Sequence, residues 1–134
     1  MRELGIGFVA YSPLGRGLLT GAYRSAADLP EGDTRTRRFP RFAPEHIEHN
    51  LALVDRVREL ADRKQCTPGQ VALAWVLAQG DDVVPIPGTK RRRYLEENVA
   101  AAEMTLDGED LAWMDANIGE ASGDRYADMG TVNR

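Results

Sequence analysis

The stretch from residue 83 to residue 98 constrains the fold of this chain most strongly. It opens with the short apolar run Val83–Ile86, and two prolines and a glycine end that run abruptly by Gly88. This pattern is typical of a buried strand with a sharp stop. Good helix formers and helical spacing of apolar residues follow from Tyr94 to Ala102. A strand, a tight glycine turn and a helix, in this order, form half of a βα unit.

Four consecutive cations, Lys90–Arg93, stand where this helix is expected to begin. The helix dipole already places partial positive charge there, so uncompensated cations would cost roughly some tenths of a kcal/mol each. A bound anion, most often phosphate, would make the contribution of these cations to stability favourable. This predicts a phosphate site at Gly88–Arg93. A second interpretation stays open. The last two arginines precede Glu96 and Glu97 by four residues, the spacing of ordinary ion pairs on a solvated helix face.

Composition limits the classes of protein that this chain can belong to. It has 134 residues, of which 43% are hydrophobic and 28% charged, as in one soluble globular domain. The net charge of −4 argues against a nucleic-acid partner. No apolar run approaches the roughly 20 residues that span a bilayer. Cys66 is the single cysteine, so no internal disulfide forms, and we expect this thiol to flank a helix. With no visible signal peptide, we expect a cytoplasmic protein.

Further elements follow from periodicity and capping residues. Residues 5–11 form a strand-like apolar run that Ser12-Pro13 stops, and residues 44–64 show the period of an amphipathic helix. A second helix is predicted from Thr67 as N-cap to Gln79; because it is apolar on most sides, we expect it to be deeply buried. A last helix is predicted at residues 107–117, with its first residue as N-cap. Two strands joined through helices indicate neighbouring parallel strands of an α/β sheet, although two strands make no independent sheet.

Three segments lack a clear period. Residues 14–21 form a glycine-rich turn, and residues 119–134 form a polar tail. Residues 23–44 form a loop that is long for a compact domain, and such loops are usually functional or disordered. Arg35, Arg37, Arg38 and Arg41 of this loop could clamp an anion, but we expect most of them to be solvated. His46 and His49 lack the spacing and the further ligands of a metal site, so we expect surface or packing histidines and no bound metal.

Five stretches stand out together: Tyr11–Gly21, Thr67–Val76, Pro85–Arg91, Glu96–Asn98 and the ending Val132-Asn133-Arg134. In combination they resemble the aldo-keto reductases, in the branch that includes bacterial oxidoreductases and the potassium-channel β subunits. The resemblance runs from Arg2 onward and preserves both order and spacing. It implies an α/β fold that is the C-terminal portion of a (β/α)8 TIM barrel, with the cofactor at the carboxyl ends of the strands. Residues 1–134 would supply the last two strands with their helices and would be incomplete as a barrel. Residues 23–44 would be the cofactor-covering loop.

The resemblance also implies NADP as cofactor and assigns its binding residues. Tyr11 would stack on the nicotinamide, and the turn Ser12, Pro13, Leu14 and Arg16 would follow the pyrophosphate. In the turn Gly88, Thr89, Lys90 and Arg91, the two cations would hold the 2′-phosphate, a role that favours NADP over NAD. Tyr94, Glu97 and Asn98 would lie beside the adenosine. Tyr11 as a core aromatic and Glu97 as a surface partner remain open.

The implied activity of the full-length form is reduction of aldehydes or ketones to alcohols by hydride transfer. In this family the catalytic group is a tyrosine acid supported by lysine, aspartate and histidine on earlier strands, and none of those elements occurs here. The only lysines are Lys64 and Lys90. With no proton donor beside the cofactor, this chain alone is expected to be inactive. The alternative is a non-catalytic NADP-binding or protein-interaction module.

Met1 falls where family members continue upstream, so we expect a truncated gene, an internal start or a split protein. The sheet edge and the barrel-facing side of the strands would then be bare. This predicts self-association or a complementing N-terminal half. The other partners implied are NADP(H) and a small carbonyl substrate.

Overall fold

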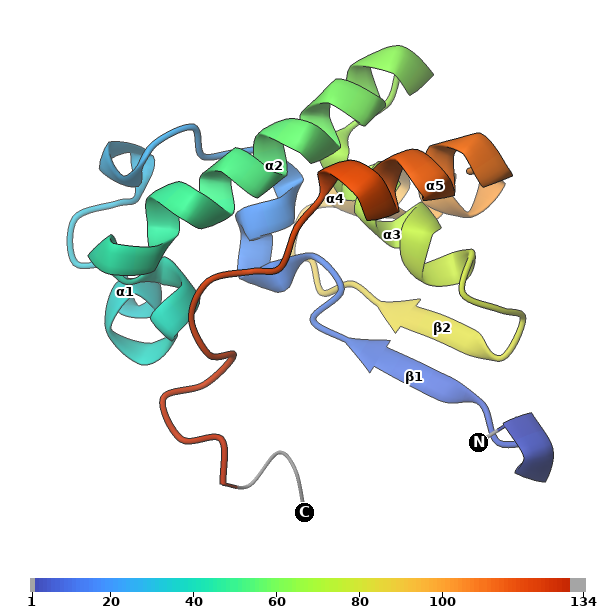
Figure 1. The fold of residues 1–134 in the computed structure, drawn as a ribbon, viewed down its shortest axis with the longest axis horizontal. Coiled ribbons are helices and arrows are strands. Elements are labelled where there is room, and N and C mark those ends of the chain that lie inside the picture. The colour runs from blue at the N-terminus through green and yellow to red at the C-terminus, as the bar shows by residue number, and fades with distance from the viewer. Residues whose placement is uncertain (1, 131–134) are drawn as a thin grey trace.

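The computed structural model describes residues 2–130, so the Val132-Asn133-Arg134 ending lies outside the described residues. Its strands and α-helices are β1 (Phe8–Tyr11), α1 (Thr34–Arg38), α2 (Pro44–Lys64), α3 (Pro68–Leu77), β2 (Val83–Ile86), α4 (Arg92–Ala100) and α5 (Gly108–Asn117). Short 3-10 turns lie at Arg2–Leu4, Gly15–Thr20, Ala26–Asp28, Pro40–Phe42 and Ala101–Glu103. Figure 1 shows the helices on one side of the two strands, with α3 between the strands and the long α2.

The two strands are parallel neighbours, as the sequence predicts. Val9 lies opposite Val84 and Tyr11 opposite Ile86, and within residues 2–130 the sheet has two strands. Their arrowheads point the same way in Figure 1, toward the turns that follow each strand. A proline just beyond each strand has no amide proton to continue the ladder. The result is an α/β unit with an open sheet, consistent with an incomplete barrel.

One face of this sheet is uncovered. Side chains alternate between the two faces of a strand, and the helix α3 packs against the sheet on one side. On the other side Val9, Val84 and Ile86 are 59%, 54% and 53% exposed. We call these three residues the apolar sheet face. Exposed apolar side chains in a contiguous group mark a surface that another part of a protein normally covers.

The helices α2 and α3 begin as their sequences predict. Thr67 is the N-cap of α3, its hydroxyl accepts from the Gln70 amide at 3.2 Å, and the Gln70 side chain returns a bond to the Thr67 amide at 3.0 Å. This capping box satisfies two amides that would otherwise be unpaired. The expectation that α3 is deeply buried holds for its first half: Val71–Ala74 are buried on all sides of the helix, whereas Trp75 is 39% exposed. The helix packs against α2, β2 and α4 and against the turn at Gly15–Thr20.

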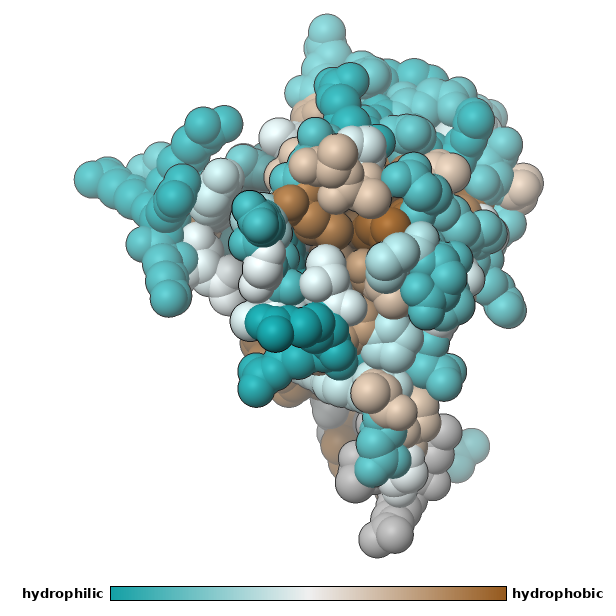
Figure 2. Space-filling model, turned by 90° about the vertical axis from the view of Figure 1, so that its left-hand side faces the viewer, coloured by the Kyte–Doolittle hydropathy of each residue, from teal (hydrophilic) through white to brown (hydrophobic). Residues whose placement is uncertain are grey.

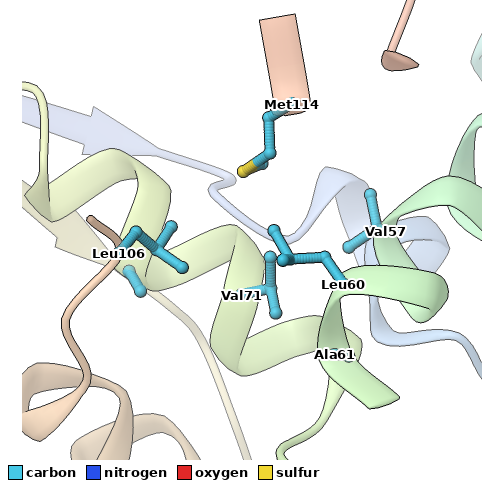
Figure 3. Close-up of a cluster of buried hydrophobic side chains, with 7 residues drawn as sticks. Val57, Leu60, Ala61, Val71, Leu106 and Met114 are labelled. Atoms are coloured by element: carbon cyan, nitrogen blue, oxygen red, sulfur yellow. The ribbon is translucent and has the colours of Figure 1, made fainter. Parts of the chain in front are cut away.

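The main core lies between α2, α3 and α5. Figure 3 shows its side chains converging from these helices and from the segment before α5. Its buried members are Val57, Leu60, Ala61, Val71, Ala74, Leu106 and Met114. A second cluster joins the glycine-rich turn to the start of α2 and consists of Leu18, Phe42, Ile47, Leu51 and Val54. Both clusters use the apolar stripe of α2, which explains why that helix organises the unit.

The segment 23–44 is more ordered than its lack of period suggests. It contains α1 and two 3-10 turns. The expectation of mostly solvated arginines holds for Arg37 and Arg38 but not for Arg35 and Arg41, which are half-buried. Asp33 caps α1 through the Arg35 amide at 2.9 Å, so the helix starts from a local side-chain bond that periodicity does not reveal. Figure 2, viewed from the side on which this segment lies, shows a mostly hydrophilic face around a central apolar patch.

The C-terminal part confirms the predicted α5 and gives the tail a fixed path. Asp107 caps α5 and forms a capping box with Asp110. The tail has no helix or strand in its described part, residues 119–130. Asn50, which is 1% exposed, accepts from the Ser122 amide and donates to its carbonyl, at 2.8 and 2.9 Å. The tail is therefore attached to α2. None of the helices described is both long and apolar enough to cross a membrane.

Candidate functional site

A cavity of about 630 Å³ opens where both strands end. The turn after β1 forms one side, the turn after β2 and the helix α4 form another, and the N-terminus of α3 lies between them. Its lining includes Ser12, Pro13, Leu14, Arg16, Gly17, Tyr23, Thr67, Gly69, Gly88, Thr89, Arg93, Tyr94, Glu97 and Asn98. This volume lies in the range of small-molecule and cofactor sites. Segments about 75 residues apart in the chain thus share one cavity because the parallel strands end at the same edge.

The turn after β1 adopts a backbone that few sequences tolerate. Arg16 and Gly17 have φ values of 58° and 92°, both in the left-handed region. Such a backbone is costly for a residue with a side chain, and Arg35 offsets that cost by donating to the Arg16 carbonyl at 2.8 Å. A Cβ at position 17 would approach the same Arg35 nitrogen to 3.3 Å. The turn therefore keeps its shape through a contact with the segment 23–44.

Arg35 is itself held by Asp33 and Tyr23. Its guanidinium meets the Asp33 carboxylate at 2.6 Å and the Tyr23 hydroxyl at 2.6 Å. The Arg35 side chain holds the pKa of Asp33 below its usual range, because it stabilises the charged carboxylate, and the same pair raises the pKa of Arg35. A charge-assisted network of this kind fixes side-chain geometry. It makes the long loop part of the cavity wall, with Tyr23 in the lining.

Position 21 ends the same turn where only glycine fits. Gly21 has a φ of 72°, and a Cβ there would lie 2.9 Å from the ring of Pro68. The Gly21 carbonyl accepts from Arg58 of α2 at 2.5 Å, and the same guanidinium also bonds the Tyr23 carbonyl at 2.7 Å. The turn is therefore pressed against the first residue of α3. This close approach brings the N-terminus of α3 to the cavity.

The turn after β2 presents cations at an uncapped helix start. The helix α4 begins at Arg92, and its N-cap, Arg91, makes no side-chain capping bond. The Thr89 hydroxyl accepts from the Arg91 amide at 3.2 Å and so closes the turn one step earlier. All four cations, Lys90–Arg93, are exposed. Free amides, a helix dipole and several cations at one place suit an anionic group.

The structure gives the cations at the start of α4 different roles, which the sequence left open. Arg92 forms the ordinary i,i+4 ion pair with Glu96 at 2.8 Å, and its side chain is 90% exposed. Arg93 instead lines the cavity, and no ion pair of residues 2–130 includes it. The ion-pair interpretation therefore holds for Arg92, whereas the phosphate site stays a prediction, with Arg93 at the cavity wall. The guanidinium carbons of Arg91 and Arg93 lie 5.9 and 5.8 Å from the Tyr94 ring centre.

Glu97 is fixed by the N-terminus of α3. The Thr67 hydroxyl donates to Glu97 Oε1 at 2.8 Å, and Gln70 Nε2 donates to the Glu97 carbonyl at 3.1 Å. Gly69 approaches the same carboxylate, since a Cβ there would lie 3.6 Å from Oε1. Glu97 is thus a half-buried carboxylate facing the cavity rather than a freely moving surface group.

Of the twelve residues predicted to bind a cofactor, nine line this cavity: Ser12, Pro13, Leu14, Arg16, Gly88, Thr89, Tyr94, Glu97 and Asn98. Lys90 and Arg91 border an adjoining hollow of about 530 Å³ that shares Gly88, Thr89 and Tyr94 with it. Tyr11 lies at the end of β1 outside both linings. Arg93, which the predicted phosphate site Gly88–Arg93 includes, also lines the cavity. The sequence prediction missed Tyr23 and Thr67 as lining residues. No local pattern marks Tyr23, because its place depends on the folded loop.

Tyr11 is joined to the tail. Its hydroxyl lies 2.8 Å from the Tyr126 hydroxyl, and the Arg125 guanidinium lies over its ring at 4.4 Å. The bond with Tyr126 raises the pKa of Tyr11, and the same bond together with nearby Arg16 lowers the pKa of Tyr126. Tyr11 is 46% exposed, so it is not a core aromatic.

The remaining candidates have structural roles. His46 Nδ1 lies 2.8 Å from the Ser122 hydroxyl, and His49 Nε2 lies 3.0 Å from the Glu120 carbonyl. Residues 2–130 contain no group of three metal-binding side chains. Burial raises the pKa of the Cys66 thiol, which disfavours the reactive thiolate.

Known proteins resemble this chain in both sequence and fold. The model of the aldo/keto reductase family matches residues 1–118. Over 105 residues the chain is 55% identical to the aldo-keto reductase yakc, named with NADP(+), of Schizosaccharomyces pombe, covering 78% of this chain and 31% of that protein. Over 133 residues it is 47% identical to the aldo-keto reductase str7 of Strobilurus tenacellus, covering 98% and 39%. The chain thus spans roughly a third of the length of the curated relatives it matches.

Two solved structures agree with this result. The glycerol dehydrogenase AKR11B4 from Gluconobacter oxydans aligns with a TM-score of 0.78 at 25% identity, over 92% of this chain and 37% of that one. The thermostable aldo-keto reductase Tm1743, in complex with the inhibitor epalrestat, aligns with a TM-score of 0.55 at 28% identity, over 87% and 31%. The fold therefore corresponds to part of an α/β barrel. The chain belongs to the aldo/keto reductase family.

Proposed function

We propose that this chain is the NADP(H)-binding C-terminal portion of an NADPH-dependent aldo-keto reductase that reduces aldehydes or ketones to alcohols. One observation carries the proposal: two turns far apart in sequence, one with Arg16 and one with the Lys90–Arg93 cations, border two adjoining hollows at the carboxyl ends of parallel strands. The position is the one at which α/β folds bind their ligands. The name of the fission yeast relative, which carries NADP(+), supports the cofactor.

The donor set fits a dinucleotide that carries an extra phosphate. Lys90 and Arg91 border the outer hollow, where an ammonium and a guanidinium would hold the 2′-phosphate. Arg16 and the turn Ser12–Leu14 would bind the pyrophosphate at the cavity's other end. Tyr94, Glu97 and Asn98 would meet the adenosine, and Tyr11 would stack on the nicotinamide. Once bound, the cofactor would supply the hydride.

We further propose that the catalytic tyrosine, lysine, aspartate and histidine come from outside residues 1–134. Lys64 and the two histidines of this chain are engaged elsewhere: Lys64 pairs with Asp110, and His46 and His49 bond to the tail. The chain alone would then bind cofactor without catalysing. A non-catalytic NADP-binding or interaction module is the second candidate, and the exposed apolar sheet face favours it. The location proposed remains the cytoplasm.

The test is binding of NADPH against NADH to the chain, followed by cofactor fluorescence. We expect saturable binding that prefers NADPH. Lys90→Ala should weaken NADPH binding about tenfold and leave NADH unchanged, because one charged phosphate contact is lost. Arg92→Ala is the matched control, since this arginine is paired with Glu96 and directed into solvent. Equal binding of both cofactors, or a folded chain that binds neither, would overturn the proposal.

We also propose that the apolar sheet face is covered by a second copy of the chain or by a complementing N-terminal half. About half of each of its side chains faces solvent, and the sheet has bare edges within the described residues. Such edges favour association with another strand. Analytical ultracentrifugation should detect assemblies of the isolated chain, and a folded monomer at all concentrations would contradict self-association.

A further inference from the structure

Four segments of the chain meet at Tyr126 of the tail. Its hydroxyl lies 2.8 Å from that of Tyr11 at the end of β1. Its ring packs edge to face against Phe39 of the loop 23–44, with ring centres 6.1 Å apart. The guanidinium of Arg16, from the turn after β1, lies 4.9 Å from the Tyr126 ring centre and 3.8 Å from that of Phe39. Tyr126 therefore contacts a strand end, a turn and a loop at once.

These contacts restrict two of the proposed cofactor residues. Arg16 lies close to two aromatic rings, and cation–π attraction favours this orientation over solvation. The exposed hydroxyl of Tyr11 has the Tyr126 hydroxyl as its hydrogen-bond partner. The neighbouring Arg125 donates to the Tyr11 carbonyl at 3.2 Å and so fixes the tail to the strand end.

The tail is attached to α2 and to the loop 23–44 just before Tyr126. Four residues earlier, Ser122 is bonded through its backbone to the buried Asn50 and through its hydroxyl to His46. Gly123, with a φ of 81°, lies so close to His46 that a Cβ would approach the ring to 2.8 Å. Arg41 of the loop donates to the Gly123 carbonyl at 3.2 Å. With the chain held at 122 and 123, Tyr126 has little freedom to leave.

We propose that Tyr126 is a positioning residue of the cofactor site, which holds Arg16 and Tyr11 in place for the pyrophosphate and nicotinamide end of the dinucleotide. This inference rests on the proposed function. It assigns to the tail a role at one end of the ligand only, because the hydrogen bond and ring contacts of Tyr126 join it to Tyr11, Phe39 and Arg16, on the side of the turn after β1. Tyr126 has no proposed role at the adenosine end of the site.

The test compares two ligands on the chain. NADPH reaches both ends of the site, whereas 2′,5′-ADP reaches only the adenosine and 2′-phosphate end. Tyr126→Phe removes the hydroxyl and keeps the ring, so we expect NADPH affinity to fall about three- to tenfold with 2′,5′-ADP affinity unchanged. Tyr126→Leu also removes both aromatic contacts and should lower NADPH affinity further. Trp113→Phe, an aromatic change on α5 beneath Arg63, is the control and should change neither affinity.

Two results would contradict the positioning role of Tyr126. Unchanged NADPH affinity in Tyr126→Phe and Tyr126→Leu would overturn it. Equal loss of both ligands would also overturn it, because that result indicates general destabilisation. Wild-type chain that binds neither ligand would reject the proposed function itself, which is a result distinct from the other two.

Discussion

The Thr67 hydroxyl joins two helices: it donates to Glu97 Oε1 of α4 at 2.8 Å and accepts from the Gln70 amide of α3 at 3.2 Å. A hydroxyl has one proton, so both bonds form together only when Glu97 is an acceptor. The same group therefore caps one helix and orients a carboxylate on another. The start of α3 and the cavity wall are coupled through this single oxygen.

Replacement of Thr67 tests this coupling. Thr67→Val keeps the shape but loses both bonds, and we expect the free energy of unfolding to fall by about 1–2 kcal/mol in urea. Thr67→Ser keeps both bonds and should stay within about 0.5 kcal/mol of wild type. Equal stability of the valine and serine variants would show that the cap contributes nothing.

The pair of Asp33 and Arg35 predicts a pH dependence of stability. Arg35 holds the pKa of Asp33 below its ordinary value of 3.8, so the stabilisation is present above that value and is lost as the pH falls through the lower folded pKa. Urea unfolding at about pH 6 and about pH 3 should therefore show a loss at the acid end. In Asp33→Asn this component of the pH dependence should disappear, with stability at neutral pH lower by about 1.5–3 kcal/mol.

Asp62→Asn is the matched control, because Asp62 is an exposed aspartate without an ion pair among the described residues. It should leave the acid loss unchanged. If Asp33→Asn retained the full acid loss, other carboxylates would account for it.

Asn50 attaches the tail to α2, and its replacement should release the tail. The side chain is 1% exposed and bonds the Arg41 carbonyl and both backbone groups of Ser122. Asn50→Ala leaves buried polar groups unpaired, so we expect a loss of about 1–3 kcal/mol. Hydrogen exchange at the Ser122 amide should become faster. His49→Gln, which changes one exposed contact to the Glu120 carbonyl, should affect both quantities less, and unchanged exchange in Asn50→Ala would contradict the attachment.

A charge on the apolar sheet face should oppose association. Val84→Lys places an ammonium group where a covering strand or second copy would otherwise bury a valine, and such burial is strongly unfavourable. Sedimentation should then shift toward monomer. Val99→Lys, an equally exposed valine on α4, should leave the distribution unchanged. The same shift in both variants would place the contact elsewhere than on the sheet.

Much of the fold could be predicted because its determinants are local. The capping residues Thr67 and Asp107 lie within three residues of the amides they satisfy, and the stripe of α2 repeats every turn. The cation cluster after β2 could be predicted for the same reason, because its residues are consecutive in the sequence. The loop 23–44 was not, because α1 depends on Asp33 binding Arg35 rather than on any period.

The sequence by itself determined the helices α2 to α5, the two strands and the family of this protein, since caps, periods and motifs act over a few residues. Only the tertiary structure decided which cations form ion pairs within residues 2–130, as Arg92 does and Arg93 does not, and which segments meet at Tyr11. The Tyr11 and Tyr126 hydroxyls are 115 residues apart in the chain. Contacts over such separations depend on how helices and turns pack, and no local pattern encodes that packing.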